Sequence, residues 1–218
     1  MKHDLNSSVT TDSRFRDADR SRQKILSAAI LEFAEHGLSG ARVDRIAEKS
    51  KLNKRLIYYY FESKDVLFTA ALESAYADIR EAERNLKLKE LDSIEAIRCL
   101  LAFTWSYYLK NPQFISLLNS ENLLRGQHIN GSPQAKATNS GLIEMLGTVL
   151  EKGRAKGVFR GGIDPVQLYI SIAGLAYFYL SNQHTLGAIF DRDLLSPKAL
   201  DQRLSHMQEL VMGYVLSN

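Results

Sequence analysis

The sequence predicts an all-α protein with an N-terminal helix-turn-helix domain and a larger C-terminal helical domain. Apolar residues recur at helical spacing along most of the chain, and each of the four prolines follows a residue that can cap a helix. No segment has the alternating pattern of a half-buried strand. We expect a disordered arm over residues 1–19, the helix-turn-helix domain over 20–66 and the second domain over 67–218.

The first helix is expected over about residues 20–36. Ile25, Ala29 and Phe33 recur there at helical spacing, and Gly37 can end the helix because glycine accepts the left-handed backbone of a C-terminal cap. The residues before this helix are mostly Ser, Thr, Asp and Arg with almost nothing apolar, which is the composition of a disordered segment.

A helix-turn-helix motif is predicted after this first helix. Val43 and Ile46 have helical spacing, the residues from Lys51 to Asn53 interrupt the pattern, and Asn53 can cap a second short helix. The first helix of the motif begins near Arg42 without a side chain suited to cap it.

The second helix of the motif has two chemically different sides. At about 100° per residue, one side is basic and aromatic and the other is apolar. The first side consists of Lys54, Arg55, Tyr58 and Tyr59, and the second of Leu56, Ile57, Tyr60 and Phe61. Cations and phenol rings on an exposed helix suit the major groove of DNA. The residues alone leave open a solvated amphipathic helix whose tyrosines help to form a core.

Residues 22–67 resemble the N-terminal domain of TetR/AcrR-type bacterial transcriptional regulators. The matching residues are Ile25, Ala28, Ala29, Phe33, Ala34, Gly37, Val43, Ile46, Ala47, Leu52, Lys54, Ile57, Tyr58, Tyr59, Tyr60, Phe61, Ser63 and Lys64. Lys51 departs from the family, which commonly has Gly in this turn, and Arg55 and Leu56 stand where relatives have small residues. The resemblance covers the first third of the chain, and the remainder only in architecture.

The motif and the resemblance together predict a DNA-binding surface. Its expected residues are Arg22, Arg42, Arg45, Asn53, Lys54, Arg55, Tyr58, Tyr59, Tyr60 and Lys64. Between Arg14 and Lys64 there are twelve Lys and Arg against seven Asp and Glu, a net charge of +5, whereas the whole chain carries +3. The basic excess therefore coincides with the motif, as expected for binding to double-stranded DNA.

Four helix starts in the second domain are marked by proline. They are Asn111-Pro112, Ser132-Pro133, Asp164-Pro165 and Ser196-Pro197. Proline is favoured at the first helical position because the N–H that it lacks has no helical partner there. A further helix is expected over residues 92–109, and a long helix that begins near Ser63 links the two domains.

The last two helices are the expected dimer elements. On the final helix an apolar seam repeats at four-three spacing, as in helices that pack on another helix. The seam consists of Leu200, Leu204, Met207, Val211 and Tyr214. The helix over 165–182 is apolar nearly all round and needs partners on more than one side. A single-chain core is the alternative, but the resemblance implies a homodimer because relatives dimerise through a four-helix bundle of their final two helices.

The second domain also carries aromatic and polar residues suited to a small-molecule pocket between helices. The expected lining residues are Trp105, Tyr108, Phe114, Asn119, Glu121, His128, Tyr169, Phe178 and Asn182. Glu121 and His128 are seven residues apart and could share a helix face, so they are the preferred polar anchors. Ordinary core packing is the alternative for each residue, and the resemblance implies an effector site in this domain.

Several function classes lack support in the sequence. No nucleophile elbow, P-loop, HExxH or GxGxxG motif is present, so we expect neither an enzyme nor a cofactor. Cys99 is the single cysteine and the five histidines lack metal-ligand spacing, which predicts no intramolecular disulfide and no metal site. Because there is no apolar run of membrane-spanning length and no apolar signal segment, we expect a cytoplasmic protein without membrane contact.

We expect a sequence-specific, homodimeric transcriptional regulator. The resemblance implies a repressor that a small organic effector releases from a palindromic operator. One alternative is an activator or effector-independent DNA binder of the same fold. Another is a helical ligand-binding or adaptor protein without operator recognition, and an all-helical enzyme would need a catalytic constellation that is not apparent.

Overall fold

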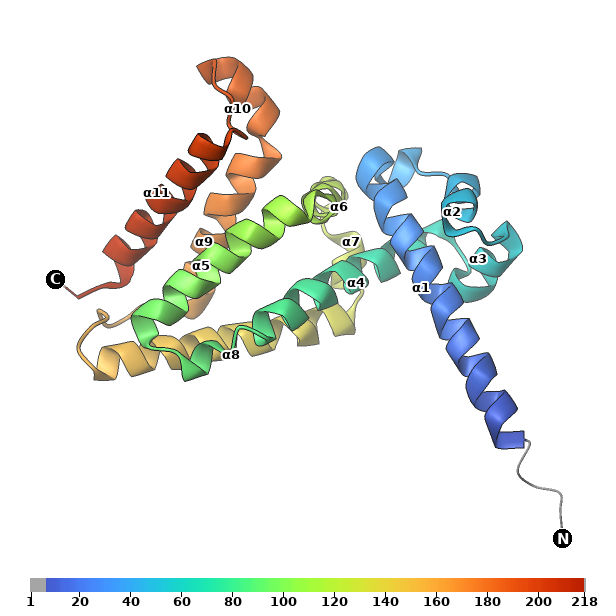
Figure 1. Ribbon diagram of the computed structural model, residues 1–218, viewed down its shortest axis with the longest axis horizontal. Coiled ribbons are helices and arrows are strands. Elements are labelled where there is room, and N and C mark those ends of the chain that lie inside the picture. Colours follow the sequence, from blue (N-terminus) through green and yellow to red (C-terminus); the bar gives the residue numbers. More distant parts are fainter. Residues whose placement is uncertain (1–6, 218) are drawn as a thin grey trace, which may run out of the picture. The chain divides into compact units, whose positions relative to one another are not determined.

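The computed structural model describes residues 7–217, apart from the side chains of residues 7–16 and 135–140. This part of the chain is built from helices, which confirms the expected all-α fold (Figure 1). The helices are α1 (Ser7–Gly40), α2 (Val43–Ser50), α3 (Lys54–Phe61), α4 (Lys64–Arg84), the 3-10 helix η1 (Leu88–Glu90), α5 (Ser93–Lys110), α6 (Pro112–Leu123), α7 (Gln127–Asn130), α8 (Pro133–Ala155), α9 (Pro165–Ser181), α10 (Gln183–Phe190) and α11 (Pro197–Val215).

The chain forms two compact units that do not follow the chain order strictly. The first unit ends at Ala75 and also includes Ser116–Gly131, and the second contains Tyr76–Ile115 and the residues from Ser132 onward. The boundaries fall inside α4 and α6, so each of these helices contributes to both units. This division differs from the single boundary expected after residue 66.

Tertiary packing explains why the segment from α6 to α7 belongs to the first unit. Leu117 is fully buried in the core of that unit, and Leu124 and Ile129 pack against the same core. These contacts join residues far apart in the sequence, so helical spacing alone gives no sign of them.

The core of the first unit confirms the apolar faces expected for its helices. Its fully or almost fully buried members include Ile25, Ala29, Phe33, Ile46, Ile57 and Phe61. The rings of Phe33 and Phe68 meet edge to face, with centroids 5.0 Å apart. Burying a side chain of this size stabilises the fold by about 2–3 kcal/mol, so a few such residues hold α1, α2 and α3 together.

α1 differs from the expected first helix at its N-terminal end. It begins at Ser7, inside the arm that the composition predicts to be disordered, and residues 1–6 lie outside the described part of the chain. Residues 7–19 are polar but include no glycine or proline to stop a helix. At the other end the helical backbone breaks at Gly37, which has φ 63° and ψ 176°, as the sequence predicts.

The turn between α2 and α3 is held by backbone and side-chain caps. The Lys51 N–H donates to the carbonyls of Ala47 and Glu48, and Lys51 itself has left-handed dihedrals of φ 58° and ψ 31°. The Asn53 carboxamide oxygen accepts from the Leu56 N–H at 2.8 Å, which confirms Asn53 as the N-cap of α3. The structure therefore places Lys51 in a conformation that favours glycine.

All four proline signals are confirmed as helix starts. The helices α6, α8, α9 and α11 begin at Pro112, Pro133, Pro165 and Pro197. The caps differ, however, because the Asp164 carboxylate accepts from the Val166 N–H at 2.7 Å, whereas the Ser196 hydroxyl donates to the Asp193 carbonyl.

α5 forms the centre of the second unit. It packs against α8, α9 and α11, and its residues Ile97, Leu100 and Trp105 are buried. Figure 1 shows α9, α10 and α11 following one another as a helical hairpin with a short helix at its tip. The sequence analysis missed α10, because it follows α9 directly after Asn182 and no side chain caps its first turn.

We expect Lys51→Gly to stabilise the first unit. Glycine removes a left-handed strain of about 1–2 kcal/mol but adds disorder to the unfolded chain, so the net gain should be about 0.5–1 kcal/mol. Urea unfolding followed by circular dichroism measures this change. Glu48→Gly, at an exposed helical position of α2, is the matched control and should lose about 1 kcal/mol. Equal losses in both variants would show that the turn is unstrained.

Candidate functional site

α3 presents a basic and aromatic face to solvent. Lys54 and Arg55 are exposed, and the exposed fractions of Tyr58 and Tyr59 are 42% and 76%. These are the four residues that helical spacing predicts on one side of the helix. A tyrosine with three quarters of its surface in water contributes little to the core of its own chain, so the alternative of core-forming tyrosines does not hold for Tyr59.

The opposite face of α3 anchors the helix. Ile57 and Phe61 are buried, and Tyr60 is half-buried. The Tyr60 ring lies edge-on to the Tyr59 ring, with centroids 5.2 Å apart, and 6.4 Å from the Phe61 ring. Tyr59 therefore rests on an aromatic neighbour on the protein side and faces water on the other.

The N-terminal end of α3 combines a capped helix with a cation. Asn53 holds the first turn, where the helix dipole leaves a positive partial charge. Lys54 Nζ lies 2.9 Å from Asp44 Oδ1, and hydrogen bonding to Asp44 raises the pKa of the Lys54 ammonium. Exposed ion pairs of this kind contribute little to stability, so the ammonium can leave Asp44 for a phosphate at small cost.

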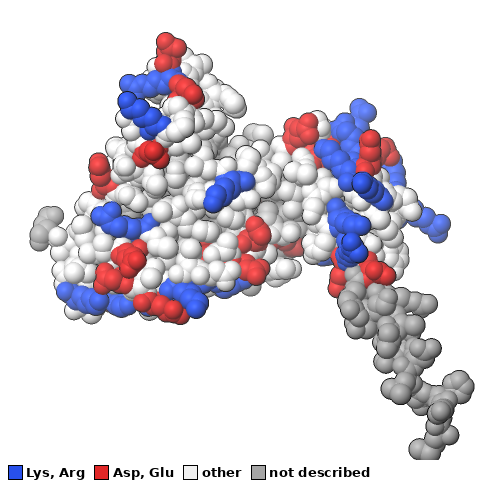
Figure 2. Space-filling view, viewed as in Figure 1, with Lys and Arg blue, Asp and Glu red and all other residues white. Residues whose placement is uncertain are grey.

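Further cations flank this helix. Arg42 is exposed at the start of α2, and the exposed Arg22 guanidinium lies 5.2 Å from the centre of the Phe61 ring. Lys64 Nζ donates to the Ala41 carbonyl at 3.3 Å. Figure 2 shows lysine and arginine side chains gathered over this unit, with acidic groups between them. The surface is therefore basic around an exposed helix that begins with a positive dipole end.

A buried carboxylate that the sequence analysis missed ties α1 to α2. Glu32 is fully buried, and its Oε1 accepts from the Arg42 N–H at 3.0 Å and from Arg45 Nε at 2.6 Å, while Oε2 accepts from Lys49 Nζ at 3.1 Å. Burial raises the pKa of Glu32, but the hydrogen bonds from Arg42, Lys49 and Arg45 outweigh it and hold that pKa below its ordinary value. Helical spacing does not predict this burial, because a glutamate next to Phe33 in the sequence is expected to face solvent.

Arg45 is engaged inside the first unit. Besides its bond to Glu32, its guanidinium donates to the Gly40 carbonyl at 2.8 Å. Of the ten residues expected to contact DNA, Arg45 and Asn53 thus have clear structural roles in holding the motif. Whether either also meets DNA stays a prediction.

Three residues expected to line an effector pocket lie in the first unit instead. They are Asn119, Glu121 and His128. The Glu121 carboxylate pairs with His128 Nδ1 at 2.8 Å and accepts from the His128 and Ile129 N–H groups at 2.8 and 3.1 Å. The two residues do meet, but across the turn between α6 and α7 rather than on one helix face. Glu121 thus caps the start of α7, and the His128 ring lies edge-on to Phe68 in the core of the first unit. Neither residue belongs to the second unit.

Tyr108, Phe114 and Tyr169 gather in the second unit, whereas the Trp105 ring packs edge-on to Tyr179. Trp105, Tyr108 and Phe114 are buried, and the rings of Tyr108 and Phe114 stack with centroids 5.7 Å apart. The Tyr169 hydroxyl accepts from an Arg80 guanidinium nitrogen at 2.5 Å. Burial raises the pKa of Tyr108 and of Tyr169, so both phenols are neutral at physiological pH.

Phe178 and Asn182 lie away from this cluster. Phe178 is 58% exposed in a groove of about 580 Å³ between α9 and α11, and Asn182 Nδ2 donates to the Phe178 carbonyl at the end of α9. Neither lines the small cavity described next. Phe178 is exposed because the apolar helix α9 has more apolar surface than its own chain can cover.

A small cavity with buried charges lies between α4 and α8. Its volume is about 80 Å³, and it is lined by Arg80, Glu83, Arg84, Gly141, Leu142 and Met145. Arg80 and Glu83 are 3% and 1% exposed and form an ion pair through Glu83 Oε2. Burial raises the pKa of the Glu83 carboxyl, and the Arg80 guanidinium opposes that rise. The sequence analysis missed this pair, because Arg and Glu three residues apart on a helix usually face water.

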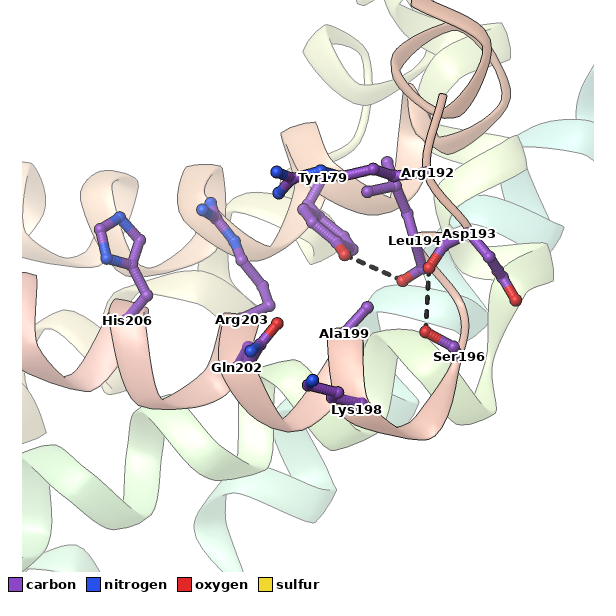
Figure 3. A pocket seen from close by; sticks show the side chains of 10 residues that line it. All are labelled: Tyr179, Arg192, Asp193, Leu194, Ser196, Lys198, Ala199, Gln202, Arg203 and His206. Carbon is purple, nitrogen blue, oxygen red and sulfur yellow. Dashed lines mark hydrogen bonds between the residues drawn. The ribbon is translucent and has the colours of Figure 1, made fainter. Parts of the chain in front are cut away.

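A larger, open hollow lies beside the start of α11 (Figure 3). Its volume is about 590 Å³, and its lining includes the cations Arg192, Lys198 and Arg203 and the carboxylate of Asp193. Two hydrogen bonds close one side of it, from the Tyr179 hydroxyl to the Leu194 carbonyl at 2.9 Å and from the Ser196 hydroxyl to the Asp193 carbonyl at 3.0 Å. The hollow is polar and wide, in contrast to the small cavity beside Arg80.

The seam expected on α11 is divided between the core and the surface. Met207 and Val211 are buried in the core of their own chain, Leu200 and Leu204 are half-buried, and Tyr214 is 43% exposed. Met207 therefore lies inside its own chain, whereas Val211, although almost fully buried, lines the groove between α9 and α11. The four-three spacing of α11 serves packing on α5 and α9 within the chain.

Comparisons with known proteins assign both parts of the chain. A family model described as "Bacterial regulatory proteins, tetR family" matches residues 25–71, and one described as "Tetracyclin repressor-like, C-terminal domain" matches residues 94–211. The chain belongs to the tetR family. This tetR-family protein is thus a DNA-binding transcriptional regulator, as the sequence predicts, and its relatives are regulators rather than enzymes.

Curated relatives match this tetR-family regulator over nearly its whole length. It is 40% identical over 202 residues to the HTH-type transcriptional repressor NicS of Pseudomonas putida, which spans 93% of this chain and 95% of NicS. The HTH-type transcriptional regulator RutR of Escherichia coli is 25% identical over 206 residues, 93% of this chain and 94% of RutR.

Solved structures agree with the fold. The transcriptional regulator SCO4942 from Streptomyces coelicolor has a TM-score of 0.66 at 25% identity and covers 89% of this chain and 98% of its own. FadR from Bacillus subtilis, solved in complex with stearoyl-CoA, also has a TM-score of 0.66, at 19% identity and with 88% and 97% covered. At that identity the likeness to FadR concerns the fold alone.

The described residues were also compared with the requirements of a metal site, a reactive cysteine and a membrane-spanning helix. Within them, no group of three or more His, Cys, Asp or Glu is placed to hold a metal ion. Cys99 is half-buried, and burial raises the pKa of its thiol. None of the described helices has both the length and the apolar character needed to cross a membrane.

We expect Glu32→Gln to destabilise the first unit by about 2–3 kcal/mol at pH 7, because it leaves Arg45 and Lys49 without their buried anion. Glu32 has a lowered pKa when folded, so its stabilisation is present above the ordinary value of 4.5 and is lost as the pH falls through the lowered folded value. Urea unfolding of both proteins between pH 7 and pH 4 should show the difference shrinking at the acidic end.

Glu35→Gln is the matched control for this test. Glu35 lies on the same helix and also approaches Lys49, at 3.5 Å, but its side chain is 63% exposed. Its loss should be small at every pH. Equal stability of the Glu32 and Glu35 variants at pH 7 would refute the role assigned to Glu32.

Proposed function

We propose that the protein is a homodimeric repressor that binds a palindromic operator and is released from it by a small organic effector. The exposed basic and aromatic face of α3 is the observation that carries the proposal, because Tyr59 is 76% exposed beside the exposed Lys54 and Arg55. Support for repression comes from NicS, which is named a transcriptional repressor and is 40% identical. The site of action is the cytoplasm, where a bacterial operator lies.

In the proposed complex α3 enters the major groove. Lys54 and Arg55 can bond to guanine edges or phosphates, and the rings of Tyr58 and Tyr59 can contact thymine methyl groups or phosphate oxygens. A two-fold dimer places two such helices in successive major grooves, which requires an operator with two-fold symmetry. Because Arg55 departs from the small residues common in the family, the operator is expected to differ from those of relatives.

Phosphate contacts fix the register of α3. Arg22, Arg42 and Lys64 surround the helix, and the Tyr60 hydroxyl is the fourth candidate. Arg45 we assign to the support of α2 through Glu32, although its half-exposed side chain could also face phosphate. Such contacts give affinity without sequence information and weaken as salt rises.

The dimer surface is proposed on the groove between α9 and α11. Exposed apolar residues gather on these two helices, with Ile170 at 55%, Phe178 at 58%, Leu210 at 47% and Tyr214 at 43% exposure. Contiguous apolar surface of this kind marks an interface, because water solvates it poorly. Of the residues expected from spacing, Tyr214 and Val211 line this groove, Leu200 and Leu204 are half-buried elsewhere on α11, and Met207 is fully buried.

Effector binding is proposed in the second unit. The buried Tyr108 and the half-buried Tyr169 lie beside a polar group, Arg80, as ligand pockets combine apolar walls with a few polar contacts. An effector releases DNA only if it binds the non-operator conformation more tightly than the operator-bound one. α4 runs from the second unit into the first, so a change at Arg80 has a continuous helix through which to act.

Selection of bound sites from randomised duplex DNA tests the proposal. We expect the full-length protein to enrich a palindromic consensus, and Lys54→Ala and Tyr59→Ala to weaken binding to it by about tenfold to a hundredfold, since a base contact contributes about 1–3 kcal/mol. Lys110→Ala, an exposed cation of the second unit, is the control and should bind normally. Enrichment of no sequence by the wild-type protein would leave the second alternative, a ligand-binding protein without operator recognition.

The dimer surface has a separate test. We expect Phe178→Asp and Leu210→Asp to give folded monomers, because an aspartate on each side of a two-fold axis introduces repulsion and buried charge at the interface. Sedimentation velocity measures the change. Leu123→Asp, at a residue of α6 that is 85% exposed, should leave the dimer intact. A dimer that survives both substitutions on α9 and α11 would place the interface elsewhere.

A further inference from the structure

The short helix α10 presents an apolar face that its own chain leaves uncovered. At about 100° per residue, Leu186, Ile189 and Phe190 lie on one side of this helix. Ile189 is 72% exposed and Phe190 is 62% exposed, and none of the described residues of α10 is buried. Single exposed apolar side chains are common on protein surfaces, but adjacent large ones form a patch, and such patches mark interaction sites.

Hydrogen bonds hold α10 and the loop that follows it in place. The Arg192 N–H donates to the Gly187 carbonyl at 3.0 Å, and the Tyr179 hydroxyl of α9 donates to the Leu194 carbonyl at 2.9 Å (Figure 3). A side chain at position 187 would place its Cβ 3.0 Å from the Arg192 carbonyl oxygen, so glycine permits this close turn. The apolar face is therefore preorganised and loses little conformational entropy when a partner covers it.

The face of α10 continues the apolar surface of α9. Phe178 lies one turn before the end of α9 and is 58% exposed, and α10 begins directly after Asn182. Figure 1 shows α10 at the tip of the hairpin that α9 and α11 form. The same hairpin carries the exposed apolar residues of the proposed dimer surface. A second copy that covers α9 and α11 therefore has α10 at its border.

The area that a permanent dimer needs favours the same occupant. Such a dimer covers about 1,000 Å² or more on each partner, and about 65% of that area is apolar. Five large apolar side chains are about half exposed on α9 and α11, namely Val166, Ile170, Phe178, Leu210 and Tyr214. At about 200 Å² for a whole side chain they offer about 500 Å², and Ile189 and Phe190 add about 250 Å². The requirement is met only when α10 is included.

We propose that Ile189 and Phe190 of α10 pack against a second copy of the chain and form the outer part of the homodimer interface. In a closed two-fold dimer each subunit contributes this contact once and receives it once, so the two copies of α10 are covered equally. The inference rests on the proposed homodimer and adds to its surface a segment that belongs to neither α9 nor α11.

Sedimentation velocity at decreasing protein concentration tests the proposal. Ile189→Asp and Phe190→Asp should each raise the dissociation constant of the dimer by about a hundredfold, because two-fold symmetry buries two added carboxylates. Ala188→Asp is the matched control. Its position is exposed on the same helix, about 150° from the middle of the apolar face, so the same charge should change the constant by less than about threefold.

The outcomes separate this inference from the homodimer itself. If the wild-type protein is a dimer whose dissociation constant is the same in Ile189→Asp and Phe190→Asp, the partner does not cover α10, and the inference fails while the homodimer stands. A monomeric wild-type protein overturns both. An effect of Ala188→Asp as large as that of Ile189→Asp would assign the loss to added charge rather than to a contact, and it also overturns the inference.

Thiol protection provides a second measurement that introduces no charge. Cys99 is the single cysteine, so in a Cys99→Ala background Ile189→Cys and Ala188→Cys each place one thiol on α10. N-ethylmaleimide should modify the Ile189→Cys thiol about tenfold more slowly in the dimer than in the monomer, because the partner covers it. The monomer is obtained by dilution or with Phe178→Asp. The Ala188→Cys thiol should react at one rate in both states, and equal rates for Ile189→Cys in dimer and monomer would overturn the proposal.

Discussion

Glu32 accepts hydrogen bonds at three points along α2, from the Arg42 N–H at its start and from Arg45 and Lys49 further along. A carboxylate with no access to water has no substitute for these donors, so α2 is held to α1 at one distance and one rotation. The turn at Lys51 and the cap at Asn53 then determine where α3 starts. The exposed face of α3 thus depends on a residue that itself never reaches the surface.

Each unit buries a glutamate, and the two glutamates differ in how many hydrogen bonds their carboxylates accept. In the first unit Glu32 meets several donors and needs nothing more. In the second unit Glu83 pairs with Arg80 through Oε2, and none of the described residues donates to its other oxygen. A fully paired buried carboxylate stabilises the packing around it, whereas a partly paired one is costly to bury.

Local signals in the sequence predicted local structure well. Pro112, Pro133, Pro165 and Pro197 each start a helix, because the preference of proline for that position depends only on its own backbone. The two faces of α3 followed from the helical period, for the same reason. The residues of the candidate DNA surface could therefore be predicted almost completely from the sequence.

Features set by contacts between distant residues could not be predicted in this way. Leu117 draws the end of α6 into the first core, and that contact moved Glu121 and His128 out of the expected effector site. Helical spacing identified the seam of α11 but not which elements would cover it, so Met207 and Val211 were expected on a surface and lie in a core. The burial of Glu32 and Glu83 was not predicted, because spacing alone cannot distinguish a buried charge from a solvated one.

The effector site proposed in the second unit also bears on how long the protein survives in a cell. A ligand that binds only the folded chain lowers the population of opened forms that proteases cleave. The molecule that removes the repressor from its operator would then also slow its degradation. Repressor would accumulate while the genes are switched on, and a larger pool would be ready to close the operator once the ligand is consumed.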